Sequence, residues 1–135
     1  MSNHFFEAMG EHLGGLSAVR IEGRMFDLAT SMVAGYGGGL WGAHYCGDVI
    51  VPELPAELGD LVRVTSQGNG ADVETDRRSA AIALALLAIN WRICELHARN
   101  APDELMDPCI EVQETLRDVT RCGAFDAIAI NALID

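Results

Sequence analysis

The chain contains no lysine. All nine of its basic residues are arginine, set against 20 aspartates and glutamates, for a formal net charge of −11. Without lysine, Schiff-base catalysis and the phosphate-binding lysine of a Walker motif are excluded. Nucleic-acid binding depends largely on neutralising phosphates with Lys and Arg, and here only Arg77 and Arg78 are adjacent. We therefore expect no direct binding to nucleic acid.

Three further absences bear on where the protein is located and on whether it contacts a membrane. The four cysteines contain no Cys-x-x-Cys pair, and the N-terminus lacks the basic region of a secretory signal, so we expect reduced thiols in a cytoplasmic protein. The longest fully apolar run, residues 80–89, is about half of the ~20 residues that cross a bilayer, so no contact with a membrane is expected. The cysteines are Cys46, Cys94, Cys109 and Cys122.

The chain does contain helical and strand patterns suited to one domain. Its 135 residues, half of them hydrophobic, suit a single unit spanning 1–135, in which 1–18 forms a peripheral segment with a short helix at 3–14. We predict an α+β fold: a small three-stranded antiparallel sheet packed with about four helices. Strands are expected at 40–45, 48–51 and 61–65, and the main helices at 19–34, 76–98, 103–121 and 124–134.

Local signals mark the ends of several of these elements. Pro52 and Pro55 are expected to end the second strand, because proline donates no hydrogen bond to a sheet. The sequence Gln67-Gly68-Asn69-Gly70 predicts a turn, and Thr75 or Asp76 can cap the following helix. The first half of that helix is apolar on every side, which predicts the most buried helix of the fold.

Five acidic residues recur at alternating spacings of three and four in the helix predicted at 103–121. At ~100° per residue they occupy one face of the helix, well away from the face that carries its apolar residues. We interpret this acidic stripe either as an ordinary solvated face or as a surface that docks a basic partner protein. Its charges are about 5 Å apart along the helix, too sparse to mimic duplex DNA, which carries one per ~1.7 Å. The stripe consists of Glu104, Asp107, Glu111, Glu114 and Asp118.

Two aromatic residues near the first strand allow two interpretations. Trp41 and Tyr45 are either core anchors or an exposed aromatic patch that contacts a partner. The preceding Gly37-Gly38-Gly39 has no lysine after it and no helix to follow, so we expect it to permit a tight turn beside Trp41 rather than to bind phosphate.

A weak zinc hypothesis rests on two pairs of residues. His44 and Cys46 share one side of a strand, while Cys94 and His97 share one side of a helix, so a helix packed across the sheet could assemble four ligands. Single buried cysteines are common, however, and a histidine near a helix end is favoured electrostatically. We therefore expect no metal and no other cofactor. A Cys46–His44 nucleophile would lack a third, orienting group, and we expect no catalytic residues.

Several short blocks, taken in order and at these intervals, resemble the ArdB/KlcA family of antirestriction proteins of plasmids and prophages. The resemblance covers roughly residues 20–135, and the ordered set rather than any one block carries it. Two departures stand out: the segment after Tyr45 is more apolar than the family's polar turn, and the first fifteen residues match nothing in it. The blocks are Tyr36-x-Gly-Gly-x-Trp41, Arg63-Val64, Gly68-Asn69, Ser79–Ile82, Gly123–Phe125 and Ala132–Asp135.

The resemblance implies a non-enzymatic protein that relieves type I restriction–modification. It carries over no catalytic residue and no cofactor, and its α/β character agrees with the fold predicted above. Because the acidic stripe suits a protein better than DNA mimicry, the expected partner is a protein component of the host defence system. Inhibition of a CRISPR effector, or a small metal- or Cys-dependent hydrolase, are the alternatives. Oligomeric state, including a homodimer, stays open.

Overall fold

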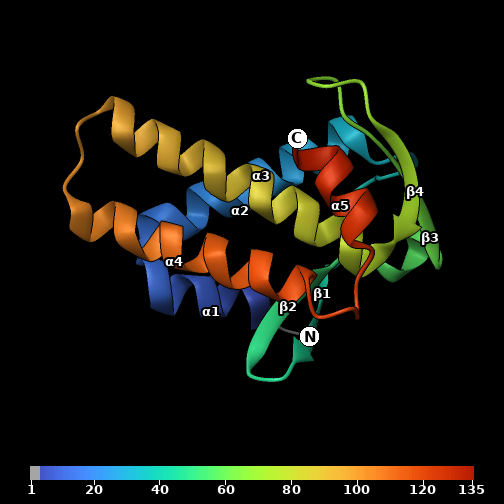
Figure 1. Ribbon diagram of the computed structural model, residues 1–135, viewed down its shortest axis with the longest axis horizontal. Helices are drawn as coiled ribbons and strands as arrows, with labels where there is room; N and C mark the ends of the chain where they lie inside the picture. The colour runs from blue at the N-terminus through green and yellow to red at the C-terminus, as the bar shows by residue number, and fades with distance from the viewer. Residues whose placement is uncertain (1–3) are drawn as a thin grey trace.

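The computed structural model describes residues 4–135, which form five α-helices and two β-hairpins (Figure 1). This confirms an α+β fold. The helices are α1 (His4–Leu13), α2 (Gly15–Met32), α3 (Arg77–Ala98), α4 (Asp103–Thr120) and α5 (Ala127–Ile134). The strands are β1 (Gly42–Cys46), β2 (Val49–Glu53), β3 (Leu61–Thr65) and β4 (Asp72–Asp76), with a 3-10 turn at Ala56–Leu58.

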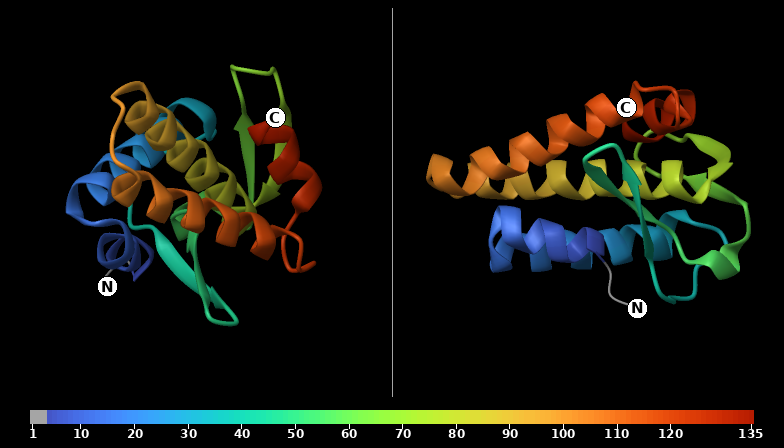
Figure 2. Two further views of the ribbon diagram at one scale, coloured as in Figure 1. Left: turned by 60° about the vertical axis from the view of Figure 1, so that its left-hand side comes forward. Right: turned by 90° about the horizontal axis from the view of Figure 1, so that it is seen from below.

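Helix α3 is the centre of the packing. It contacts α2, α4, α5 and β2, and it runs antiparallel to α4 (Figures 1 and 2). The loop that joins α3 to α4 lies at the opposite end of the molecule from the β3–β4 hairpin (Figure 1). Residues 80–86 are all buried, as the apolar sequence predicts. By length and composition alone α3 could cross a membrane, but its most apolar 18-residue window is 67% buried inside the protein, as in the core helix of a soluble domain.

The β-structure differs from the predicted three-stranded sheet. β1 pairs only with β2, and β3 pairs with β4, so the two antiparallel hairpins form separate sheets. β4 is absent from the sequence prediction because its acidic residues are depleted in strands. In the folded chain Asp72 and Glu74 face solvent and Thr75 is buried, so the alternation of a half-buried strand is present. The turn predicted at 67–70 connects these two strands.

Pro52 does not end the second strand as predicted. β2 continues to Glu53, and Pro52 lies opposite Ala43 in the register with β1. In a two-stranded ribbon each strand needs a backbone hydrogen bond only from alternate residues, so one missing N–H is tolerated. The chain changes direction after β2, through Pro55 and the 3-10 turn, which separates β2 from β3.

The N-terminal segment is part of the core rather than peripheral, as far as the described residues from 4 onward show. Phe5, Phe6, Met9 and Leu13 of α1 are buried, so α1 packs its apolar face against α2. The Phe6 ring lies 5.5 Å from that of Phe26 on α2, in an edge-to-face arrangement that aromatic pairs favour. The periodicity of the sequence predicts α1 as a helix. It does not predict that α1 packs against α2, because that contact joins two separate segments.

Trp41 packs against the same two rings, Phe6 and Phe26, and extends the aromatic cluster. Its side chain is only 2% exposed, its ring centroid lies 5.6 Å from that of Phe26, and its Nε1 donates a hydrogen bond to the Tyr36 hydroxyl at 3.0 Å. Two of the three glycines before it, Gly38 and Gly39, have a positive φ that other residues rarely adopt. Gly39 has a φ of +102°, and a Cβ there would lie 2.9 Å from Glu57 Oε1. The assigned turn lies at residues 34–35, just before the triple glycine, rather than at the triple glycine where the sequence predicts it.

Two aspartates cap the helices that flank the β3–β4 hairpin. Asp76 accepts a hydrogen bond from the Ser79 amide, which confirms the predicted cap of α3. Asp126 caps α5 through the Ala129 amide and accepts a second hydrogen bond from the Thr75 hydroxyl at 3.0 Å. The start of α5 is therefore fixed to the end of β4, and α5 begins three residues later than predicted.

Replacing Trp41 tests this packing. We expect Trp41→Ala to lower the free energy of unfolding by about 3–5 kcal/mol, because it removes a buried indole and leaves a cavity. Tyr45→Ala is the matched control: its side chain is 63% exposed, so its effect should stay within about 0.5 kcal/mol. Urea unfolding followed by circular dichroism measures both, and equal losses would contradict the assigned burial of Trp41.

Candidate functional site

The acidic stripe lies on the outer face of α4. All five of its residues, Glu104, Asp107, Glu111, Glu114 and Asp118, are exposed. On the opposite face Cys109, Leu116 and Val119 are buried, where α4 packs against α3. The helix thus separates its charges from its apolar residues as predicted, and the stripe is accessible to a macromolecule.

Two neighbouring side chains lie within ion-pairing distance of the stripe. His12 Nε2 lies 3.2 Å from Glu111 Oε2, and Arg121 Nη1 lies 3.2 Å from Asp118 Oδ1. All four of these side chains are at least half exposed, so such pairs stabilise the fold little. Within residues 4–135, Glu104, Asp107 and Glu114 have no assigned ion-pair partner. Their charges face solvent.

An apolar cavity of about 280 Å³ lies beside the stripe. It opens between α1, the β1–β2 hairpin and α4, and Met9, Ile50 and Leu116 are among its walls. A second hollow, lined by Asp118 of the stripe, lies at the tip of the hairpin and shares Val49 and Thr115 with the first. One side of α4 is therefore a concave strip with an acidic border.

The two aromatic candidates are separated by the structure. Trp41 is a core residue and takes no part in a surface patch, which corrects the partner-binding interpretation for that residue. Tyr45 is 63% exposed on β1, close to the hairpin tip, so it remains available to a partner. The difference arises because Trp41 precedes β1 and turns into the aromatic cluster, whereas Tyr45 lies in the part of the hairpin that extends into solvent.

The four zinc candidates are not assembled into one site. Within residues 4–135, no three His, Cys, Asp or Glu side chains are placed to hold a metal ion. Cys94 and His97 are exposed on α3, and the neighbour of the Cys46 sulfur is not Cys94 or a histidine but Cys122, 3.7 Å away. The hypothesis required the helix to cross the β1 face near Cys46. Instead, the turn that follows α4 occupies that position.

Cys46 is also poorly suited to act as a nucleophile. Its contact with the Cys122 sulfur, together with loss of solvent around it, raises the pKa of the Cys46 thiol. A raised pKa lowers the fraction of thiolate, which is the nucleophilic form. The assigned partner of the Cys46 thiol is therefore the Cys122 thiol, and not the His44 side chain that a nucleophile pair would require.

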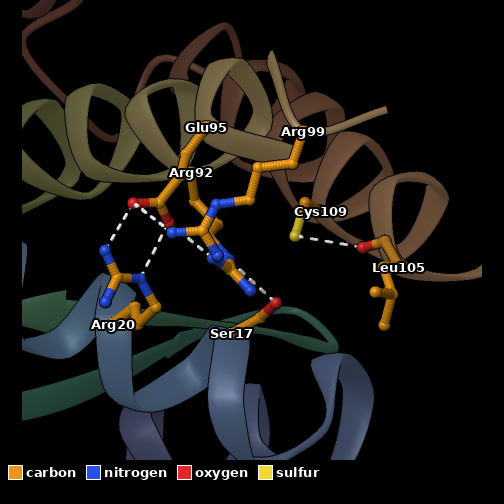
Figure 3. A network of polar contacts seen from close by, with 7 residues as sticks. All are labelled: Ser17, Arg20, Arg92, Glu95, Arg99, Leu105 and Cys109. Atoms are coloured by element: carbon orange, nitrogen blue, oxygen red, sulfur yellow. Dashed lines mark hydrogen bonds and ion pairs between the residues drawn. The ribbon is translucent and has the colours of Figure 1, made fainter. Parts of the chain in front are cut away.

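A partly buried ionic network joins α2 to α3 (Figure 3). Arg20 donates from Nε to Glu95 Oε1 at 2.7 Å and from Nη2 to Oε2, a two-point contact between the helices. Arg92, only 2% exposed, also bonds Glu95 and donates from Nε to Ser17 Oγ at 3.1 Å. These bonds hold the pKa of Glu95 at about 2, below its usual 4.5, with the Arg20 contact as the largest cause.

The sequence interpretation missed this network. Arg92 and Glu95 are charged residues three apart, directly after the apolar half of α3, which signals an ion pair. Arg20 lies 75 residues from Glu95, a separation that no local pattern reveals. Arg20 also covers the ring of Trp91, with its guanidinium carbon 5.3 Å from the centroid, so Trp91 lies at the α2–α3 boundary and is only half-buried. We assign this network to holding the helices together.

Comparison with known proteins assigns no function to the surface of α4. No protein-family model matches the chain, and no curated protein matches it. Its role therefore has to be inferred from its own geometry and from the ordered sequence blocks.

Glu95→Gln tests the network through pH. The folded-state pKa of Glu95 lies below its unfolded value, so its contribution to stability is present above pH 4.5 and is lost as the pH falls toward 2. We expect the variant to be less stable than the wild type by about 3 kcal/mol near neutral pH, because Arg92 is left buried without its carboxylate. This difference should shrink as the pH is lowered.

Urea unfolding at several pH values between about 7 and 3 measures this difference. Asp27→Asn is the control, since Asp27 is exposed and its removal should change stability by no more than about 0.5 kcal/mol. A Glu95→Gln deficit that stays constant over the whole range would contradict the assignment.

Proposed function

We propose that this protein is a non-enzymatic inhibitor of host restriction, encoded by a plasmid or prophage, that relieves type I restriction–modification by binding one of its protein components. The observation that carries the proposal is the acidic stripe: five exposed carboxylates on one face of α4, whose other face is buried. A basic surface on the restriction complex, or on a factor that it needs to translocate or cut DNA, is the partner.

The charge pattern supports a protein partner over nucleic acid. With a net charge of −11 the chain as a whole repels phosphates. The acids of the stripe repeat about every 5 Å along α4, which is sparser than DNA phosphates but suits a basic protein patch. Complementary charge of this kind speeds association and orients the two partners.

The chemistry around the hairpin supports a function without catalysis. The pKa of Cys46 is raised rather than lowered, which disfavours a nucleophilic thiol. The neighbouring cavity of about 280 Å³ has mainly apolar walls, and a hydrolase site needs several converging polar groups. Binding energy on this side of α4 comes from shape, apolar area and the acidic border.

The choice of a restriction system as target rests on the resemblance to ArdB/KlcA. The blocks that carry it include Tyr36–Trp41, whose two aromatic side chains are hydrogen-bonded to each other, and Ser79–Ile82, which lies in the first part of α3. These blocks therefore concern the framework that positions α4, and they do not include the acids of the stripe. Target and docking surface are accordingly tested by two different experiments.

The first experiment tests the target. Unmodified phage is plated on matched hosts with and without a type I restriction system, each with and without expression of this protein. We expect expression to raise the efficiency of plating on the restricting host alone. Equal restriction with and without expression of the folded protein would remove the proposed target.

The second experiment tests the surface. Glu104→Gln, Asp107→Asn and Glu114→Gln are combined, because these three exposed acids have no assigned ion-pair partner within residues 4–135. We expect the triple variant to relieve restriction about tenfold less well, since each lost contact contributes up to about 1 kcal/mol at an exposed site.

The matched control removes the same number of charges elsewhere. Asp27→Asn, Glu57→Gln and Glu74→Gln lie on α2, the 3-10 turn and β4, and all three residues are exposed. This control should keep relief close to wild type. Equal loss in both triple variants would assign the effect to net charge, and full relief by the α4 variant would exclude the stripe as the docking surface.

A further inference from the structure

Two thiols that are distant in the sequence meet at the tip of the β1–β2 hairpin. Cys46 Sγ at the end of β1 lies 3.7 Å from Cys122 Sγ in the turn after α4, although 76 positions separate them. Both line the hollow that also contains Gly47 and Asp118. Cys122 is exposed and Cys46 half-buried, so reagents in solution reach the pair.

We propose that Cys46 and Cys122 form a reversible intramolecular disulfide when the protein meets a low-molecular-weight disulfide such as oxidised glutathione. This modification site goes beyond the proposed function and does not depend on it. The bond would tether the hairpin tip to the C-terminal end of α4.

The geometry requires only a small movement. The sulfurs must approach from 3.7 Å to about 2.05 Å, which side-chain rotation and a slight shift of either turn can supply. Each cysteine is followed directly by a glycine in a left-handed conformation, Gly47 with φ +61° and Gly123 with φ +86°. Cys46 is therefore the last residue of β1, directly before the hairpin turn, and Cys122 lies in the turn after α4.

The reaction is two successive thiol–disulfide exchanges. The Cys122 thiolate attacks one sulfur of oxidised glutathione, forms a mixed disulfide and releases one glutathione thiolate. The Cys46 thiol then loses its proton, attacks the Cys122 sulfur and releases the second glutathione. Two protein thiols are oxidised and one glutathione disulfide is reduced to two thiols, so electrons and atoms balance.

The surroundings set the order of the two steps. Cys122 is the more exposed sulfur, and its contact with Cys46 raises the pKa of the Cys46 thiol, which disfavours Cys46 as the first attacking thiolate. Cys122 is therefore the attacking residue and Cys46 the resolving residue. In the reverse direction, excess reduced glutathione or dithiothreitol reopens the bond.

The other two cysteines provide internal controls. Cys109 is fully buried between α4 and α3, where loss of solvent raises its pKa, so it should not react in the folded protein. Cys94 is exposed on α3 and has no neighbouring thiol within the described chain. It can accept glutathione but cannot resolve the adduct into an intramolecular bond.

The test is equilibration of the folded protein with glutathione buffers of increasing oxidation, followed by thiol counting and mass spectrometry of peptides. We expect a Cys46–Cys122 cross-link within the monomer, reversed by dithiothreitol. Closing a loop of this length should also raise Tm by about 10 °C in the oxidised form.

Three variants separate the steps. Cys46→Ser should accumulate a stable glutathione adduct on Cys122, because the resolving thiol is missing. Cys122→Ser should lose the cross-link, and Cys94→Ser should form it as the wild type does. Peptide mapping of the wild type decides the matter even if a variant fails to fold. A protein that keeps both thiols free in oxidised buffer, or that forms only bonds between molecules, would overturn the proposal.

Discussion

Burial of the first half of α3 on every side is the constraint that arranges the rest of the molecule. Residues 80–86 have essentially no exposed surface, and alanine recurs through this part of the helix, so neighbouring elements approach its backbone closely. No single partner can cover a helix that is apolar all round, so α2, α4, α5 and β2 surround it. α4 must then use its apolar face for α3, and its acids have only the solvent side left.

Five arginines form ion pairs away from the acidic face of α4. Arg20, Arg92 and Arg99 converge on Glu95 between α2 and α3, and Arg77 and Arg78 meet Glu53 near the start of α3. Much of the positive charge is thus engaged in holding elements together. The acids of α4 are about 5 Å apart, within the ~8 Å Debye length at physiological salt, so their fields add where a partner would approach.

The sequence predicts features that depend on neighbouring residues better than features that depend on contacts between distant segments. The number of helices is as predicted, their ends lie within four residues of the predicted ones, and the acidic stripe is exposed as predicted, because the 3.6-residue period is a local property. The sequence does not predict β4 or its pairing with β3, because Asp72 and Glu74 are residue types depleted in strands. The alternation of this strand becomes clear only from the burial of Thr75. The sequence left the orientation of Trp41 open, because burial at the edge of a strand depends on the aromatic rings brought to it by α1 and α2.

Contacts between distant segments account for what could not be predicted at the candidate site. The zinc hypothesis paired Cys46 with Cys94 because both belong to recognisable elements, but the direction of the β1–β2 hairpin depends on how β2 packs against α3, α1 and α4. That packing brings the hairpin tip to the end of α4. Asp118 of the acidic stripe, the hollow beside it and the two thiols consequently share one corner of the fold. A bond between those thiols would restrict the hairpin while leaving the rest of the stripe unchanged, because the other four acids precede Asp118 along a helix held in place by α3.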